Sequence, residues 1–195
     1  MRSKLFTGTT TGYVLFLCCF SMSVIASDNY IEELVAKNEP AVLVIEGVRK
    51  DGAVTQSSGC VVQKSGLILT TAHQVTDIKE LKGRQSDGTT YTLSVLEVDE
   101  DRELALLKAD RGFAAAAEIG NARALNAGAT LVTIATPVNL DFSVATGIVA
   151  NTSRTFRGYP VIQAELTAAP GSSGGPVFNK TGQVIGLIMG VLEEQ

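Results

Sequence analysis

The residues of this sequence with the most specific chemistry are a histidine and a pair of serines. His73 is the only histidine among the 195 residues. Ser172 and Ser173 lie about a hundred residues later in the segment GSSGGP, residues 171–176. A serine hydroxyl becomes a good nucleophile when a neighbouring neutral imidazole accepts its proton. The segment therefore has two interpretations, a flexible loop of small residues or a loop that carries a nucleophilic serine.

One common nucleophile motif fits the letters of this segment but not its surroundings. GSSGG satisfies G-x-S-x-G, the nucleophile elbow of α/β-hydrolases, which requires a helix after the serine and a histidine later in the chain. Here Pro176 and a strand-like segment follow, and His73 lies upstream. The remaining order is histidine, acid, serine, which chymotrypsin-type enzymes use on β-barrels.

The elements that must position these residues are predicted to be mostly β-strands. Short segments rich in β-branched residues alternate with turns. They form two groups, at 41–48, 59–63, 67–71, 91–98 and 104–108, then at 130–135, 143–150, 159–166, 176–178 and 183–188. A helix is predicted at 30–38, before Pro40. Residues 110–128 lack sustained alternation, so we expect a connector between two β-units of about equal size.

The first 26 residues have the pattern of a secretory signal peptide. Arg2 and Lys4 precede an uncharged apolar run at 13–26 that ends in small residues. The alternative is a membrane anchor, but the run is shorter than the roughly 20 residues that span a bilayer. We expect cleavage after Ala26, no stable membrane insertion of the mature chain, and a periplasmic or secreted location.

The mature chain predicted in this way is acidic and has one cysteine. Cleavage removes two basic residues and no acidic ones, so the net charge becomes more negative than the −4 of the full sequence. No basic patch for nucleic acid is apparent. Cys18 and Cys19 leave with the signal peptide, and Cys60, beside two valines, is predicted to be a small buried hydrophobe. We predict no metal site and no cofactor.

Four segments in order resemble the trypsin-like serine proteases, in particular the bacterial HtrA/Deg branch. They are SGCVVQKSGLILTTAHQV (58–75), VDEDRELALLK (98–108), IGNARALNAGATLVTIATPV (119–138) and AAPGSSGGPVFNKTGQVIGL (168–187). The similarity covers roughly residues 30–190. It implies a chymotrypsin-like double β-barrel, with a first barrel at 27–110 and a connector and second barrel at 111–195.

The resemblance also implies the roles of individual residues. Ser173 matches the nucleophile, His73 the general base and Glu103 the acid that orients the base. The backbone N–H groups of Gly171 and Ser173 match the oxyanion hole. The segments that flank the nucleophile correspond to the substrate-binding residues Thr167, Ala168, Ile188, Met189 and Gly190. Thr167 stands where a trypsin would carry an acid, so we expect cleavage after small aliphatic rather than basic residues.

Two features depart from the family pattern. Glu103 stands where the family has aspartate, and its extra methylene must be absorbed by the backbone or by the rotamer. By the resemblance, a further strand and a helix would follow residue 195 to complete the second barrel, and we expect neither these elements nor a PDZ domain in this chain. We therefore expect a second barrel that is incomplete at its C-terminus.

These features lead to one predicted function and two alternatives. The resemblance implies a serine endopeptidase that hydrolyses polypeptides through an acyl-enzyme intermediate. One alternative is a pseudoprotease that binds extended peptides by strand addition near residues 188–190. The other is a truncated product without activity. An oligomer is compatible with the sequence, which does not specify one.

Overall fold

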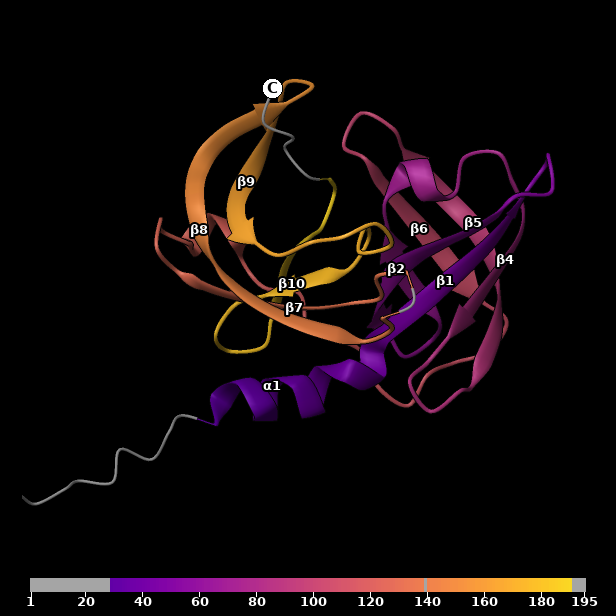
Figure 1. The fold of residues 1–195 in the computed structure, drawn as a ribbon, viewed down its shortest axis with the longest axis horizontal. Coiled ribbons are helices and arrows are strands. Elements are labelled where there is room, and N and C mark those ends of the chain that lie inside the picture. Colours follow the sequence, from indigo (N-terminus) through magenta and orange to yellow (C-terminus); the bar gives the residue numbers. More distant parts are fainter. Residues whose placement is uncertain (1–28, 139, 191–195) are drawn as a thin grey trace, which may run out of the picture.

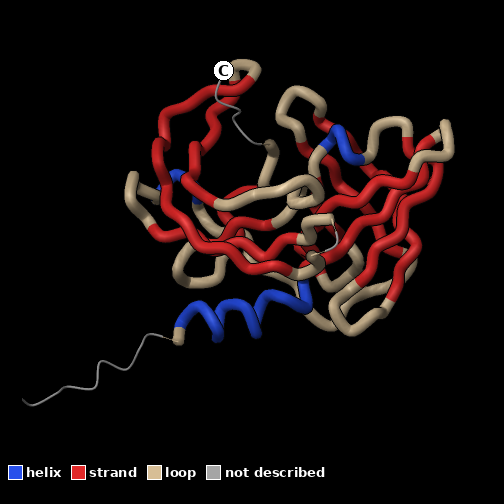
Figure 2. The backbone as a smooth tube through the Cα atoms, in the orientation of Figure 1, coloured by secondary structure: helices blue, strands red, loops and turns tan. Residues whose placement is uncertain are grey.

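A computed structural model describes residues 29–138 and 140–190. The predicted signal peptide lies outside the described residues. The elements, in chain order, are α1 (Tyr30–Asn38), η1 (Glu39–Ala41), β1 (Val42–Arg49), β2 (Val54–Gln63), β3 (Leu67–Thr70), η2 (Ala72–Gln74), β4 (Ile78–Arg84), β5 (Thr90–Asp99), β6 (Leu104–Ala109), η3 (Ala122–Ala124), β7 (Thr130–Ala135), β8 (Ser143–Phe156), β9 (Tyr159–Leu166), β10 (Pro176–Phe178) and β11 (Val184–Leu187). Strands dominate and the helices are short (Figure 2). The prediction of an all-β fold is confirmed.

The first six strands form a closed barrel in the order β1-β2-β3-β6-β5-β4. All of its pairs are antiparallel, and β1 closes the barrel by pairing with both β2 and β4. The barrel occupies the right-hand side of Figure 1. Closure leaves none of its six strands with an unpaired edge, so the barrel is a rigid support for residues at its rim.

The remaining five strands form an open sheet in the order β11-β10-β7-β8-β9. In Figure 1, β8 and β9 curve together around the left-hand side of the molecule. Within the described residues β11 and β9 are edge strands, so this second barrel is incomplete, as expected.

The larger hydrophobic core joins the two halves. It contains residues of the first barrel such as Leu43 and Ile68, and also Ile134 and Phe178 of the second sheet. Leu34 of α1 is buried in the same core, and the helix lies below the second sheet in the view of Figure 1. The two halves are therefore packed against each other through apolar side chains.

The sequence prediction of the strands was wrong in a few places. The strand β4 (Ile78–Arg84) was missed, because in it only Leu81 and Gly83 are buried and most of the other residues are charged. The strand β8 continues to Phe156, beyond the predicted range 143–150, although most of its second half is exposed. In both places backbone pairing with a neighbouring strand holds an element that has little apolar pattern.

Candidate active site

The pairing of two strands brings His73 next to Glu103. His73 lies in η2 just after β3, and Glu103 lies in the turn just before β6. The strands β3 and β6 pair so that Thr70 faces Ala105. The end of one strand and the start of the other therefore meet at the same rim of the first barrel.

The imidazole and the carboxylate are hydrogen-bonded to each other. The His73 Nδ1 atom lies 2.6 Å from Glu103 Oε1, and the His73 backbone N–H donates to the same oxygen at 2.8 Å. Burial opposes ionisation of Glu103, but the hydrogen bonds from His73 and the charge of Arg157 outweigh it and hold the pKa of Glu103 below its usual value. An ionised carboxylate accepts the Nδ1 proton, so the lone pair of the neutral ring is on Nε2, where a general base needs it.

The backbone of Glu103 has an unusual conformation. Its φ angle is +59°, in the left-handed region that few side chains adopt. The carbonyl group of Glu103 accepts a hydrogen bond from the N–H of Ala72 at 3.3 Å. In this conformation the Glu103 side chain reaches His73 and accepts two hydrogen bonds from it.

The nucleophile loop, residues 167–175, connects β9 to β10. Gly171 has a φ angle of +94° and Gly174 of +83°. A Cβ atom at position 174 would overlap the Ser58 carbonyl oxygen and the Thr70 hydroxyl, so only glycine fits there. The two adjacent serines differ in their roles. Ser172 is buried and its Oγ accepts a bond from the Ala169 N–H at 3.2 Å, whereas Ser173 is only half-buried.

The backbone N–H groups around the predicted nucleophile differ in whether they are hydrogen-bonded. The N–H of Ser172 donates to Ala169, and the N–H of Gly174 donates to Ile188 at 2.8 Å. The N–H groups of Gly171 and Ser173 donate to no acceptor within the described residues. Two free donors at positions 171 and 173 are what an oxyanion hole requires.

Ser58 of the first barrel anchors this loop. Its backbone N–H donates to the Ser173 carbonyl oxygen at 2.9 Å, and its hydroxyl donates to the Gly171 carbonyl oxygen at 2.9 Å. The same Oγ accepts the Thr136 N–H at 2.8 Å. Ser58 is not among the predicted site residues, because its only signal in the sequence is that of a polar residue in the middle of a strand.

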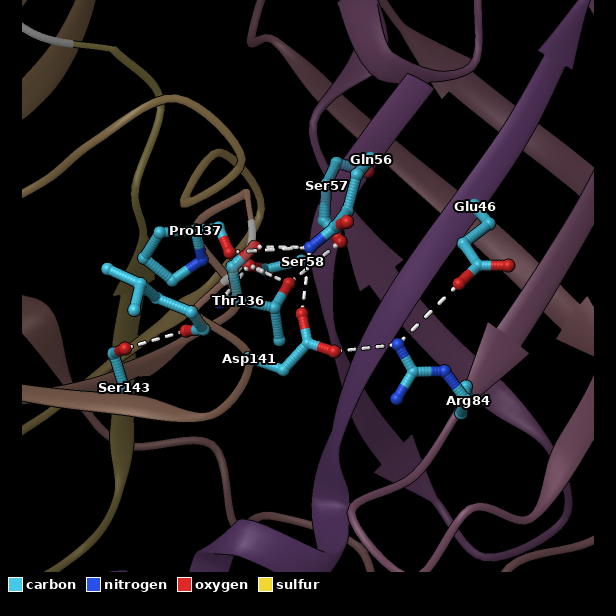
Figure 3. Close-up of polar contacts among 10 residues, drawn as sticks. Glu46, Gln56, Ser57, Ser58, Arg84, Thr136, Pro137, Asp141 and Ser143 are labelled. Atoms are coloured by element: carbon cyan, nitrogen blue, oxygen red, sulfur yellow. Dashed lines mark hydrogen bonds and ion pairs between the residues drawn. The ribbon is translucent and has the colours of Figure 1, made fainter. Parts of the chain in front are cut away.

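A second polar network lies beside Ser58 and joins the two halves (Figure 3). The amide Nε2 of Gln56 donates to Asp141 Oδ1 at 2.9 Å and to the Thr136 carbonyl oxygen at 3.1 Å. Arg84 donates to the other oxygen of Asp141 at 2.7 Å. These bonds tie the segment that follows β7 to β2 and β4, and that segment is the one against which Gly171 packs.

Ser173 and His73 are not hydrogen-bonded to each other. In the described part of the chain the Ser173 hydroxyl makes no hydrogen bond to the imidazole. The side-chain amide Nε2 of Gln74 lies 2.7 Å from His73 Nε2 instead. The structure therefore joins the predicted base to the predicted acid and leaves the predicted nucleophile without a bond to the base. The three catalytic roles stay a prediction.

The predicted substrate-binding residues lie on both sides of the nucleophile loop. Thr167 is exposed, and Ala168 packs partly against the smaller core of the second sheet. Ile188 is buried. Its backbone N–H donates to the Gly175 carbonyl oxygen, and its carbonyl oxygen accepts the Gly174 N–H. Gly190 is exposed. Met189 contributes to a cavity of about 240 Å³, which is lined by Asp101, Arg102, Leu104, Phe156, Tyr159, Pro160, Val161 and Met189.

Within residues 29–138 and 140–190, no group of three or more His, Cys, Asp or Glu side chains could hold a metal ion. None of the helices that the structure describes is long and apolar enough to cross a membrane. Cys60 is fully buried in the larger core, which confirms its predicted role as a small hydrophobe.

Known proteins resemble this chain in sequence. The model of the trypsin-like peptidase domain family matches residues 57–187. Serine protease HTRA1 of Xenopus laevis is 35% identical over 173 residues, which cover 82% of this chain and 38% of that protein. A probable periplasmic serine endoprotease DegP-like of Pseudomonas fulva is 34% identical over 144 residues, which cover 72% of this chain and 30% of that protein. The chain thus spans well under half the length of these relatives.

Solved structures share the fold. The HtrA-type protease AlgW with a decapeptide superimposes with a TM-score of 0.77 at 21% identity, over 84% of this chain and 60% of that one. AlgW with a tripeptide gives a TM-score of 0.76 at 24% identity, over 80% and 53%. The likeness confirms the chymotrypsin-like arrangement of two barrels. With the family model and the sequence relatives, it shows that this chain belongs to the trypsin-like peptidase domain family, in its HtrA-type branch.

Proposed function

We propose that this chain is a serine endopeptidase that hydrolyses polypeptides through an acyl-enzyme intermediate. The observation that carries the proposal is the bonded pair of His73 and Glu103, because an imidazole fixed with its proton on Nδ1 presents a basic Nε2. The free N–H groups of Gly171 and Ser173 support it. Family membership supports the same chemistry, although the relatives are much longer than this chain.

The proposed reaction begins when Ser173 Oγ attacks the carbonyl carbon of a peptide bond. His73 Nε2 takes the hydroxyl proton, and the N–H groups of Gly171 and Ser173 stabilise the negative charge on the carbonyl oxygen. The C–N bond then breaks, and His73 gives its proton to the leaving amine. A water molecule attacks the acyl group while His73 accepts its proton, and the Ser173 oxygen leaves and recovers that proton.

This reaction requires the Gln74 amide to leave His73 Nε2 and the Ser173 hydroxyl to form a hydrogen bond with that atom. The Gln74 amide donates to His73 Nε2, so it occupies the lone pair that must accept the serine proton. A side-chain rotation of Gln74 frees that lone pair. Catalytic hydrogen bonds are often absent in structures without substrate and form only in the complex.

We further propose the class of substrate and the location. Thr167 provides no carboxylate near the nucleophile loop, so we expect cleavage after small aliphatic residues such as alanine and valine. The Ile188 backbone is engaged by the loop, so Met189 and Gly190 are left to pair with an extended substrate. A periplasmic or secreted location is proposed from the N-terminal sequence, and the name of the Pseudomonas fulva relative contains the word periplasmic.

A fluorophosphonate probe tests the proposal. We expect one covalent adduct per chain, at Ser173, visible as a mass increase of the intact protein. Ser173→Ala should abolish the adduct, and Ser172→Ala, the matched control at the neighbouring serine, should keep it. A folded parent chain that forms no adduct, or an adduct that survives Ser173→Ala, would overturn the proposal. Peptide binding without hydrolysis would then be the better description of the protein.

A library of peptides tests the specificity separately. We expect cleavage mainly after alanine or valine. A profile dominated by lysine or arginine would contradict the assignment of Thr167.

A further inference from the structure

The hairpin that joins β8 to β9 reaches across to the predicted catalytic acid. Its turn is the pair Arg157-Gly158, with φ angles of +50° and +84°. Two successive residues with positive φ form the tight turn that suits a twisted hairpin. In Figure 1 the tip of this hairpin, at the top of the second sheet, points toward the first barrel.

The hairpin and the turn that precedes β6 contact each other through two arginines. Arg157 of the hairpin donates from Nη1 to the Glu100 carbonyl oxygen at 2.7 Å. Arg102 of the turn lies over the Tyr159 ring of the hairpin, with its Cζ 4.5 Å from the ring centre. Each half therefore places one guanidinium group against the other half, and the hydrogen bond of Arg157 and the cation–π contact of Arg102 hold the hairpin at the rim that carries Glu103.

The two carboxylate oxygens of Glu103 have different partners. Oε1 accepts both hydrogen bonds from His73, as described above. Oε2 lies 3.7 Å from Arg157 Nη1. The titratable or charged side chains that face this carboxylate are thus His73 from its own barrel and Arg157 from the other half. A glutamate has one more torsion than an aspartate, so a contact on the second oxygen limits a rotation that the bonds to Oε1 alone would leave open.

We infer that Arg157 is a positioning residue. It holds the Glu103 carboxylate so that this carboxylate keeps its hydrogen bonds to His73. The inference rests on the proposed function, in which Glu103 serves as the acid. Among the described residues Arg157 makes no hydrogen bond or ion pair with His73 or with the nucleophile loop, and its two polar partners on the first barrel, Glu103 and the Glu100 carbonyl oxygen, both belong to the turn that precedes β6. The acid of the site is then complete only when the hairpin of the second sheet is docked on the first barrel.

The single histidine makes this inference testable without turnover. The Nδ1 proton of His73 gives one low-field NMR signal as long as an ionised Glu103 accepts it. Arg157 lies 3.7 Å from Glu103 Oε2 and its charge lowers the pKa of Glu103, so Arg157→Gln should raise the pH at which acid abolishes the signal. Arg157→Lys, which keeps the charge, should restore most of the difference.

Arg154→Gln is the matched control on the same hairpin. Arg154 donates to Gln163 at 2.9 Å and has no contact with Glu103 in the part of the chain that the structure describes. This variant should behave as the parent does. If Arg157→Gln and Arg154→Gln give the same signal and the same pH response, the inference is overturned.

Turnover of a small ester gives the second measurement. Arg157→Gln should lower kcat by about 3- to 10-fold with KM unchanged, because the acid acts on the transition state and not on ester binding. An unchanged kcat would contradict the inference. If the parent chain hydrolyses nothing, the proposed function fails, and the NMR comparison still decides whether Arg157 positions Glu103.

Discussion

The two halves of this molecule contribute to one predicted site, but one half is a closed barrel and the other is an open sheet. The first barrel is closed, and four consecutive residues of β1, 42–45, are almost completely buried. The second sheet is open in the described residues, and its edge strand β9 has no fully buried residue. The predicted acid and base belong to the closed half, and the predicted nucleophile belongs to the open half.

The difference shows how a loop of the open sheet can be fixed in position by the closed barrel. The nucleophile loop does not depend on its own sheet alone, because Ser58 of the first barrel bonds to the carbonyl oxygens of Gly171 and Ser173. Conversely, Arg157 of the second sheet lies 3.7 Å from the carboxylate of Glu103 in the first barrel. We infer that the geometry of the site depends on the docking of the halves more than on closure of the second barrel.

The largest expected effect concerns the acid on the closed half. Glu103→Gln keeps the side-chain length but presents the wrong donor pattern to His73, so kcat for a small ester should fall by about 10⁴-fold, as in the corresponding aspartate-to-asparagine change of a related protease. Glu103→Asp should be intermediate, because its shorter side chain must reach the same Nδ1 from an unchanged turn. Equal rates for the three chains would remove position 103 from the catalytic machinery.

The next effect tests whether the nucleophile loop depends on the first barrel. Ser58→Ala leaves the buried Thr136 N–H without its acceptor and frees the Gly171 carbonyl group. We expect kcat to fall by about tenfold and the free energy of unfolding to fall by about 2 kcal/mol. Ser57→Ala, at the neighbouring buried serine, is the control and should change kcat little. If both variants are equally active, the bonds of Ser58 do not set the geometry of the loop.

The next prediction concerns the pH dependence of stability and originates in the closed half, at Cys60. Burial raises the pKa of the Cys60 thiol from 9.0 to about 12. Between these values the unfolded chain loses the thiol proton and the folded chain keeps it, so stability falls as pH rises above about 9. At pH 10.5 the loss should be about 2 kcal/mol. Urea unfolding at pH 8 and pH 10.5 measures it, and Cys60→Ala should remove this part of the decline. A decline of the same size in both chains would assign it to other groups.

The smallest effect compares the two cores directly. Val61 of β2 and Val149 of β8 are both fully buried, one in the larger core and one in the smaller. The same change to alanine at each should cost more in the closed barrel, by about 1 kcal/mol, because an open sheet collapses around the lost methyl groups more easily. Chemical denaturation of the two variants gives the difference. A larger cost at Val149 would mean that the open sheet is the more rigid half.

Much of the fold follows from local pattern. The helix at Tyr30–Asn38 and the strands at Thr130–Ala135, Tyr159–Leu166 and Pro176–Phe178 have the predicted bounds. Runs of β-branched residues between turns specify strands wherever one face is buried. The charged strand β4 has no such pattern, and only its pairing with β1 and β5 defines it.

The sequence by itself determined which residue types could act and the order in which they occur. Its motifs identified His73, Glu103 and the glycines of the nucleophile loop, because these residues carry local signals of chemistry or backbone shape. Only the tertiary structure decided what holds them. Ser58 and Ser173 are far apart in the chain, as are Arg157 and Glu103, and each pair meets because two sheets pack in one orientation. That orientation depends on the shape of a shared apolar core, and no short segment of sequence encodes it.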